Sequence, residues 1–352
     1  MVRVAAEKLP DTVELPVREA ERAVERLFRD LRQTAILSGK EDEAGGVTLG
    51  EMSRSYGALI VLLASIWGAS YLFIKVGVRD FEPTLLVTMR LLTASLLLLA
   101  FLVVKEGGRQ ALSEVRRVWR QGLVFGTING VIPFVLITWG EKHIDSGVAA
   151  IANASVPIFV ALLAIKFNPQ ERSTGMKLAG VLVGLVGVGV LAGVHPKGGT
   201  WAMIGTLAVV LASFSYACGG LYGQRALRSA TGPVLATASM LYGGLVLLPF
   251  ALFQLPDHTP GWKPVASVLG LAIGGTAVAQ LILFRVLRLF GAARLSLVTY
   301  LMPGFALVYG ALILSEPLRP TMLIGLGLIL GGVALGSGVW RPARRVAAEP
   351  TS

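Results

Sequence analysis

Apolar residues fill most of this chain in long stretches that short polar segments interrupt. Each stretch has about 20 residues, the length that a helix needs to cross roughly 30 Å of hydrocarbon with its backbone groups bonded internally. The connections carry turn residues, as in Phe81-Glu82-Pro83 and Asn168-Pro169. The pattern predicts an all-α membrane protein with ten transmembrane helices, at residues 57–77, 84–104, 121–140, 147–165, 175–194, 202–222, 233–253, 265–284, 295–314 and 321–340.

Composition agrees with a membrane protein and argues against several other classes. The 352 residues are 54% hydrophobic and only 15% charged, which is outside the usual balance of a soluble domain. The net charge of +11 is spread over short loops, so we expect no contiguous basic surface and no nucleic-acid partner. Cys218 is the single cysteine, and no metal-ligand cluster is apparent in the sequence. We expect no cofactor and no metal, and a lipid bilayer around the chain.

The distribution of Lys and Arg predicts the orientation of the helices. One set of alternate connections holds five of these residues, whereas the other set together with the C-terminal segment holds sixteen. Positive charge is retained on the cytoplasmic side of a membrane. Both termini are therefore expected in the cytoplasm, and a plasma (inner) membrane is the expected location.

Short sequence matches recur between the two halves of the chain at nearly constant offsets. The pairs are Leu63-Ala64-Ser65 with Leu211-Ala212-Ser213, Gly122 with Gly270, Gly126 with Gly274, Pro157 with Pro303, and Glu171 with Glu316. Five spans in each half is an odd number, so the second half must be inverted relative to the first, as in many secondary transporters. We expect two inverted five-helix repeats at 57–194 and 202–340, with a cytoplasmic N-terminal extension at 1–56 and a cytoplasmic tail at 341–352.

Four segments of the chain together resemble a known family. They are Trp67-Gly68-Ala69-Ser70-Tyr71-Leu72-Phe73-Ile74-Lys75, Arg90-Leu91-Leu92, Asn153-Ala154-Ser155-Val156-Pro157 leading to Glu171-Arg172, and Pro303 leading to Glu316-Pro317-Leu318. Their order and duplication resemble the EamA family of the drug/metabolite transporter (DMT) superfamily over about residues 57–340. The resemblance implies a ten-helix bundle with both termini inside that moves small metabolites, often amino acids or related compounds and often outward.

Two charged residues, Lys75 and Arg90, lie clearly inside predicted spans. Charge in the apolar layer is costly, so such residues usually face the bundle interior or a wet cavity. They could attract a carboxylate or phosphate, or form switchable pairs with Glu141 or Glu82. The structural alternative is snorkelling by Lys75 and a fixed pair for Arg90. We expect no carboxylate deep in the bundle, because the glutamates lie near span ends; proton antiport and facilitated exchange both stay open.

Neutral polar and aromatic side chains within the spans are candidates for the wall of a substrate site. Together with Lys75 and Arg90, the predicted substrate-binding residues are Trp67, Tyr71, Asn129, Asn153, Tyr216, Gln280 and Tyr300. For each of them alone, the alternative role is helix–helix hydrogen bonding. The glycine-rich spans at 175–194 and 321–340 favour close packing within one chain, and a homodimer is a further possibility.

The N-terminal extension differs from the rest, with nine Lys and Arg against eleven Asp and Glu in residues 1–56. Apolar residues at helical spacing predict one amphipathic helix at about 15–36. Translation could alternatively start at Met52, which would remove most of this extension.

The leading functional hypothesis is a secondary transporter that exports small metabolites by alternating access. A membrane scaffold or receptor would explain the spans but not the inverted repeat. A membrane-embedded enzyme would need acidic clusters for metal and phosphate or a nucleophile constellation, and the sequence offers neither. We therefore expect no enzymatic activity and a small molecule as the principal partner.

Overall fold

The structure of this chain, a computed structural model, describes residues 49–167, 175–193, 199–295 and 297–337. Contacts divide the chain into two units, Met1–Ser55 and Tyr56–Ser352, and the second unit holds the bundle described below. The amphipathic helix expected at 15–36 and the tail at 341–352 lie outside the described residues.

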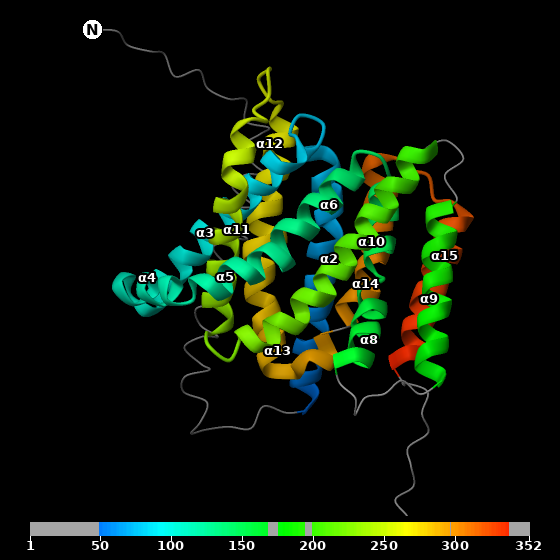
Figure 1. The fold of residues 1–352 in the computed structure, drawn as a ribbon, viewed down its shortest axis with the longest axis horizontal. Coiled ribbons are helices and arrows are strands. Elements are labelled where there is room, and N and C mark those ends of the chain that lie inside the picture. The colour runs from blue at the N-terminus through cyan, green and yellow to red at the C-terminus, as the bar shows by residue number, and fades with distance from the viewer. Residues whose placement is uncertain (1–48, 168–174, 194–198, 296, 338–352) are drawn as a thin grey trace, which may run out of the picture. The chain divides into compact units, whose positions relative to one another are not determined.

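The described residues form helices and contain no strand (Figure 1). The helices of the first half are α2 (Leu49–Gly77), α3 (Pro83–Glu106), α4 (Gly108–Arg117), α5 (Trp119–Gly126), the π-helix η1 (Thr127–Val131), α6 (Ile132–Glu141), α7 (Ser146–Asn153), α8 (Val156–Phe167) and α9 (Gly175–Gly193). Those of the second half are α10 (Gly199–Ala226), α11 (Gly232–Leu252), α12 (Trp262–Ala272), the π-helix η3 (Ile273–Val278), α13 (Ala279–Leu295), α14 (Leu297–Leu314) and α15 (Pro320–Ser337).

Eight segments of the described chain are long and apolar enough to cross a membrane. They are Gly57–Gly77, Pro83–Glu106, Trp119–Glu141, Ser146–Leu163, Gly199–Ala226, Gly232–Leu252, Trp262–Gly291 and Leu297–Leu314. Two shorter apolar helices, Leu178–Leu191 and Pro320–Leu335, occupy the remaining predicted positions. The fold is that of a multi-pass membrane protein, with eight clear spans where ten were expected and two shorter helices beside them.

Two elements differ from the sequence expectation. The segment before α5 was expected to be a loop, but it forms α4, an amphipathic helix that buries Ala111 and Val115 and leaves its arginines exposed. Those two residues pack against α11 in one apolar cluster, and this burial stabilises a helix that composition alone does not suggest. The second difference is α13, which continues eleven residues past the expected end at 284 to Leu295. It changes direction at Gly291, whose φ of 78° favours glycine.

Helices from the two halves pack in reciprocal pairs. The second helix of each half meets its counterpart as α3 against α11, and the fifth as α9 against α15. The third helix of the first half packs against the first of the second half, α6 against α10. The reverse pair is α2 against α13, which share the cluster containing Leu63 and Ile282. Such exchange of partners is expected of two repeats related by a pseudo-two-fold axis.

Glycines allow α9 and α15 to approach closely, and Figure 1 shows the two helices side by side at one edge of the bundle. A Cβ atom added at Gly187 would lie 2.9 Å from the backbone nitrogen of Ile329, and one at Gly332 would lie 2.5 Å from the carbonyl oxygen of Gly180. These small residues therefore serve contacts within one chain, which was the favoured interpretation. The homodimer stays a prediction.

Candidate functional site

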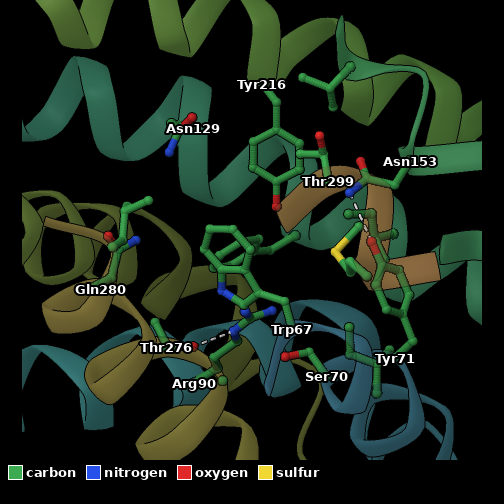
Figure 2. A pocket seen from close by; sticks show the side chains of 17 residues that line it. Trp67, Ser70, Tyr71, Arg90, Asn129, Asn153, Tyr216, Thr276, Gln280 and Thr299 are labelled. Atoms are coloured by element: carbon green, nitrogen blue, oxygen red, sulfur yellow. Dashed lines mark hydrogen bonds between the residues drawn. The ribbon is translucent and has the colours of Figure 1, made fainter. Parts of the chain in front are cut away.

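Side chains from both halves surround a cavity of about 280 Å³ inside the bundle. Figure 2 shows Arg90, Trp67 and Tyr216 directed into it from different helices. Its lining is Trp67, Ser70, Tyr71 and Ile74 of α2, Arg90 of α3, Asn129 of η1, Phe134 and Ile137 of α6, Asn153 of α7, Val156 of α8, Tyr216 of α10, Gly275 and Thr276 of η3, Gln280 and Leu283 of α13, and Thr299 and Met302 of α14. A cavity between two repeats is the usual place of a transporter's substrate site.

Seven of the nine predicted substrate-binding residues line this cavity. They are Trp67, Tyr71, Arg90, Asn129, Asn153, Tyr216 and Gln280. The other two lie outside its wall: Tyr300 packs against the main apolar cluster, and Lys75 has partners in a neighbouring turn. The sequence thus located a common surface from positions far apart in the chain, and the binding roles of these residues stay predictions.

Arg90 is the charged residue of the cavity wall, and only 5% of its surface is exposed. Its Nε donates a hydrogen bond of 2.8 Å to Oγ1 of Thr276. Its guanidinium carbon lies 3.6 Å from the centroid of the Phe134 ring, in a cation–π arrangement. Among the residues that the structure describes, no carboxylate forms an ion pair with it. A guanidinium fixed at one edge in this way can offer its remaining donors to a carboxylate or phosphate.

A short chain of hydrogen-bonded polar side chains contributes a second part of the wall. Asn153 donates from Nδ2 to the Tyr71 hydroxyl at 2.8 Å, and the Ser213 hydroxyl lies 3.1 Å from Oδ1 of Asn153. The helix is broken at this point, because α7 ends at Asn153 and α8 begins at Val156. Pro157 has no N–H to bond the carbonyl of the residue four positions earlier, which is Asn153. The proline therefore removes the helical partner of the Asn153 carbonyl, which instead accepts a hydrogen bond of 3.5 Å from the Ser213 hydroxyl beside the cavity.

Two π-helical turns carry polar residues into the site at matching positions of the two halves. In the first half η1 holds Asn129, and the carbonyl of Ile128 accepts a hydrogen bond of 2.6 Å from the Ser215 hydroxyl. In the second half η3 holds Thr276, whose hydroxyl donates to the carbonyl of Leu271 at 2.9 Å. π-Helical turns widen the backbone and are frequent at functional sites. The matched glycines are Gly126, directly before η1, and Gly274, within η3, but no residue pattern in the sequence distinguishes a π turn from an α turn here.

Of the roles open to Lys75, an ion pair with Glu141 or Glu82 is not formed among the described residues. Its Nζ donates to the backbone carbonyls of Glu141 and Ile144, each at 2.7 Å. Glu82 pairs instead with Lys142 at 2.8 Å. Glu141 lies at the end of α6, as expected from the sequence, yet it has no exposed surface. The turn after α6 folds back towards α2, and the Lys75 bonds hold it there.

Several cavity residues were missed by the sequence reasoning. Ser70 and Ile74 lie three and seven positions after Trp67, so helical spacing places them on the same face of α2. That spacing was a usable signal. Phe134 and Thr276 are different, because their importance depends on their contacts with Arg90, and neither residue type is distinctive in an apolar span. Their roles required the three-dimensional arrangement.

The imidazole of His143 lies outside the spans, in the turn between α6 and α7. It stacks on Trp201 with ring centroids 5.4 Å apart and lies 4.7 Å from the Trp139 ring. Burial lowers the pKa of His143 below its ordinary value, and the nearby ammonium groups of Lys142 and Lys75 lower it further. This end of the bundle is thus held by aromatic contacts around a neutral imidazole.

Comparisons with known proteins agree with this architecture. The uncharacterized inner membrane transporter YedA of Escherichia coli is 28% identical over 284 residues, covering 80% of this chain and 89% of that protein. The probable amino-acid metabolite efflux pump of the same species is 26% identical over 307 residues, covering 84% of this chain and 99% of the pump. One solved crystal structure with 21% identity has a TM-score of 0.59 and covers 82% of this chain and 99% of its own, which supports the fold.

The sequence pattern of one family matches both halves separately. The EamA-like transporter family model aligns with residues 55–193 and again with 203–337. The two aligned segments contain every residue that lines the cavity, and they account for most of the chain. The resemblance inferred from the duplicated segments is confirmed: the chain belongs to the EamA-like transporter family.

Proposed function

We propose that this protein is a secondary transporter that exports small metabolites bearing a carboxylate, such as amino acids or related compounds, by alternating access. The observation that carries the proposal is Arg90, a buried guanidinium on the wall of the cavity between the repeats, with no carboxylate ion-paired to it in the described part of the chain. An unpaired buried charge is costly unless a ligand supplies its counter-charge. A substrate carboxylate would do so bidentately.

The remainder of the wall suits the other parts of an amino-acid-like molecule. Rings of Trp67, Tyr71 and Tyr216 and apolar side chains such as Ile137 surround the space. Aromatic faces and neutral oxygens can receive an ammonium group without a full negative charge, and they also accept apolar substituents. A cavity of about 280 Å³ suits a small molecule rather than a peptide. The substrate should therefore be compact, with one carboxylate and an apolar or amphipathic body.

The direction and the topology rest on other observations. The relative named as an amino-acid metabolite efflux pump supports both an amino-acid-like substrate and outward movement. The relative named as an inner membrane transporter supports a plasma-membrane location. The sixteen-to-five distribution of Lys and Arg supports cytoplasmic termini and ten crossings, with α9 and α15 counted as spans.

The test is counterflow in proteoliposomes loaded with unlabelled amino acids, followed by entry of the labelled compound. For each active amino acid, its methyl ester and its decarboxylated amine are compared as competitors. We expect the parent compound to compete. Both derivatives should compete at least about tenfold more weakly, because each lacks the charge-assisted bonds of the carboxylate. Equal competition by the amine would contradict the carboxylate assignment. Absence of counterflow across the panel, in folded protein, would favour the scaffold interpretation.

Two arginine variants connect this test to the site. Arg90→Ala should raise the half-saturation concentration about tenfold or more and remove the preference for the parent acid over its amine. Arg90→Lys should recover only part of the preference for the parent acid, because an ammonium cannot form the bidentate pair. Arg79→Ala is the matched control, because Arg79 is exposed in the connection after α2 and outside the cavity. A loss of flux that is the same for acid and amine would indicate a structural role for Arg90.

A further inference from the structure

Glu141 is a buried carboxyl group that the proposed substrate site does not use. It is the last residue of α6 and has no exposed surface. Neither of its carboxylate oxygens has a hydrogen-bond partner in the ranges that the structure describes. Buried polar atoms are nearly always bonded, so a carboxyl with both oxygens unbonded needs an explanation. An ionised carboxylate is far more costly in such a place than the neutral acid.

The charged groups around Glu141 come from three directions, and in the described part of the chain none of them bonds to its carboxylate oxygens. The hydroxyl of Tyr71, on α2, also interacts with Glu141 electrostatically. On α2, the ammonium of Lys75 bonds to two backbone carbonyls, those of Glu141 itself and Ile144. On α3, Arg90 bonds to Thr276 in the cavity wall. In the connection before α15, Glu316 accepts hydrogen bonds from the backbone and hydroxyl of Ser146. The stretch of α10 that contacts the end of α6, residues 205–209, carries no titratable side chain.

Glu141 and Lys75 lie next to the cavity, one on α6 and the other on α2. Ile137 lines the cavity one helical turn before Glu141, and Tyr71 lines it one turn before Lys75. Four residues of helix correspond to about 6 Å along the axis. Glu141 and Lys75 therefore separate the cavity from the turn that joins α6 to α7. Any opening of the cavity towards that end must disturb the Lys75 bonds and change the surroundings of the carboxyl group.

We propose that Glu141 is the proton-binding site that couples transport to a pH gradient, in exchange for the substrate. This inference rests on the proposed transport function. The carboxylate takes a proton to form the neutral acid while the site is open to the more acidic side. It returns the proton to water on the other side. In the ionised state the ammonium of Lys75, which in this structure bonds to the backbone carbonyl of Glu141 itself, supplies the counter-charge.

The alternative is a carboxyl group that stays permanently neutral and only fills space. The two roles differ in what the neutral isostere Glu141→Gln does. If Glu141 carries the coupling proton, the variant imitates the protonated form, which binds the substrate more weakly. Exchange of labelled for unlabelled substrate should continue at a raised half-saturation concentration, because exchange needs no net proton movement. Accumulation driven by a pH gradient should be lost. A space-filling role predicts that both activities persist.

The experiment measures counterflow and gradient-driven accumulation in the same proteoliposomes. With one proton per substrate, a difference of about one pH unit should support about tenfold accumulation by wild-type protein, and an accumulation ratio of about one is expected for Glu141→Gln. Glu82→Gln is the matched control, because Glu82 is an exposed glutamate at the same end of the bundle, paired with Lys142. It should keep both activities.

Each outcome has a distinct meaning. Gradient-driven accumulation by Glu141→Gln would overturn the proton site, and so would wild-type counterflow that ignores the gradient; both would leave the transport function intact. No counterflow by wild-type protein would overturn the transport function itself. If the variant does not fold, the wild-type protein in weakly buffered detergent provides the test through a pH indicator. The proposal predicts that adding the active substrate releases protons, and no release would overturn it.

Discussion

The two repeats share backbone devices and differ in side-chain chemistry. Both have a π turn at a matched glycine, and both have a proline four positions after a cavity residue, Pro157 after Asn153 and Pro303 after Thr299. The charged residues of the first repeat, in contrast, have uncharged counterparts in the second. At the 148-residue offset, the second-repeat counterparts of Lys75, Arg90 and Glu141 are Gly223, Ala238 and Leu289.

The packing gives a physical reason for this difference. The second-repeat counterpart of Tyr71 is Gly219, and a Cβ added there would lie 2.7 Å from Oδ1 of Asn129. Likewise Gly223 lies against the ring of Phe125. In the first repeat, Tyr71 and Lys75 fill the space beside their helix. At the matching positions of the second repeat, which are glycines, Asn129 and Phe125 of the first repeat fill it instead. Duplication maintains the bundle and both repeats line the cavity, whereas Arg90, the charged residue of its wall, comes from the first repeat.

The largest expected effect tests the shared part of this comparison. Gly187→Leu and Gly332→Leu should each lower the free energy of unfolding by about 3 kcal/mol, because the new side chain would overlap the backbone of the facing helix. Thermal unfolding in detergent, followed by tryptophan fluorescence, measures the loss. Gly189→Leu and Gly331→Leu are matched controls on the same helices, with open space at the Cβ position. Stability equal to that of the controls would show that the close α9–α15 contact is not formed.

The next effect tests the asymmetric part. Thr276→Val removes the hydrogen-bond acceptor of Arg90 Nε and should raise the half-saturation concentration for a carboxylate substrate about tenfold, since hydrogen bonds to charged groups are among the strong ones. Initial rates of counterflow give the value. Thr138→Val is the control of equal size, because its buried hydroxyl has no partner among the described residues. If both variants behave alike, Thr276 does not position the guanidinium.

Sequence periodicity was enough to predict most of the bundle. Long apolar runs bounded by Pro, Gly and charged residues gave helices such as α3 and α11 within two residues of their ends, because membrane spans must bond their backbones internally. The failure at α4 has a clear cause: its stability comes from Ala111 and Val115 packing on α11, a contact between distant segments. Local pattern does not contain that information.

The site was predictable to a different degree. Polar and aromatic residues inside apolar spans are rare, so Arg90, Asn129 and Gln280 could be predicted as site residues. All three line the same cavity. Partners could not be predicted in the same way. The bonds of Lys75 to carbonyls and the burial of Glu141 depend on how the turn after α6 folds back. A residue at a span end looks exposed until its neighbours are placed.

A smaller effect is expected where the second repeat supports the first. Both oxygens of Glu316 accept hydrogen bonds at the start of α7, from the backbone N–H groups of Ser146 and Gly147. Glu316→Ala should lower the free energy of unfolding by about 1–2 kcal/mol, the usual cost of a lost cap. Asp145→Ala is the control, because Asp145 occupies the N-cap position without bonding through its side chain. Equal losses of unfolding free energy in the two variants would show that Glu316 does not cap α7.

The smallest effect concerns the stacked imidazole at the end of α6, whose counterpart in the second repeat is Gly291. Because burial and two ammonium groups lower the pKa of His143 in the folded protein, the neutral ring is favoured there and protonation is easier in the unfolded chain. Its contribution to stability is therefore complete above the ordinary histidine pKa of about 6.5 and declines as the pH falls below it. Unfolding temperatures measured between neutral and mildly acidic pH should fall slightly more for wild-type protein than for His143→Gln, which keeps the same charge throughout. The difference should be small, because the ring is only partly buried and solvent weakens the interaction. A steeper decline in the variant would mean that the protonated ring is the stabilised form.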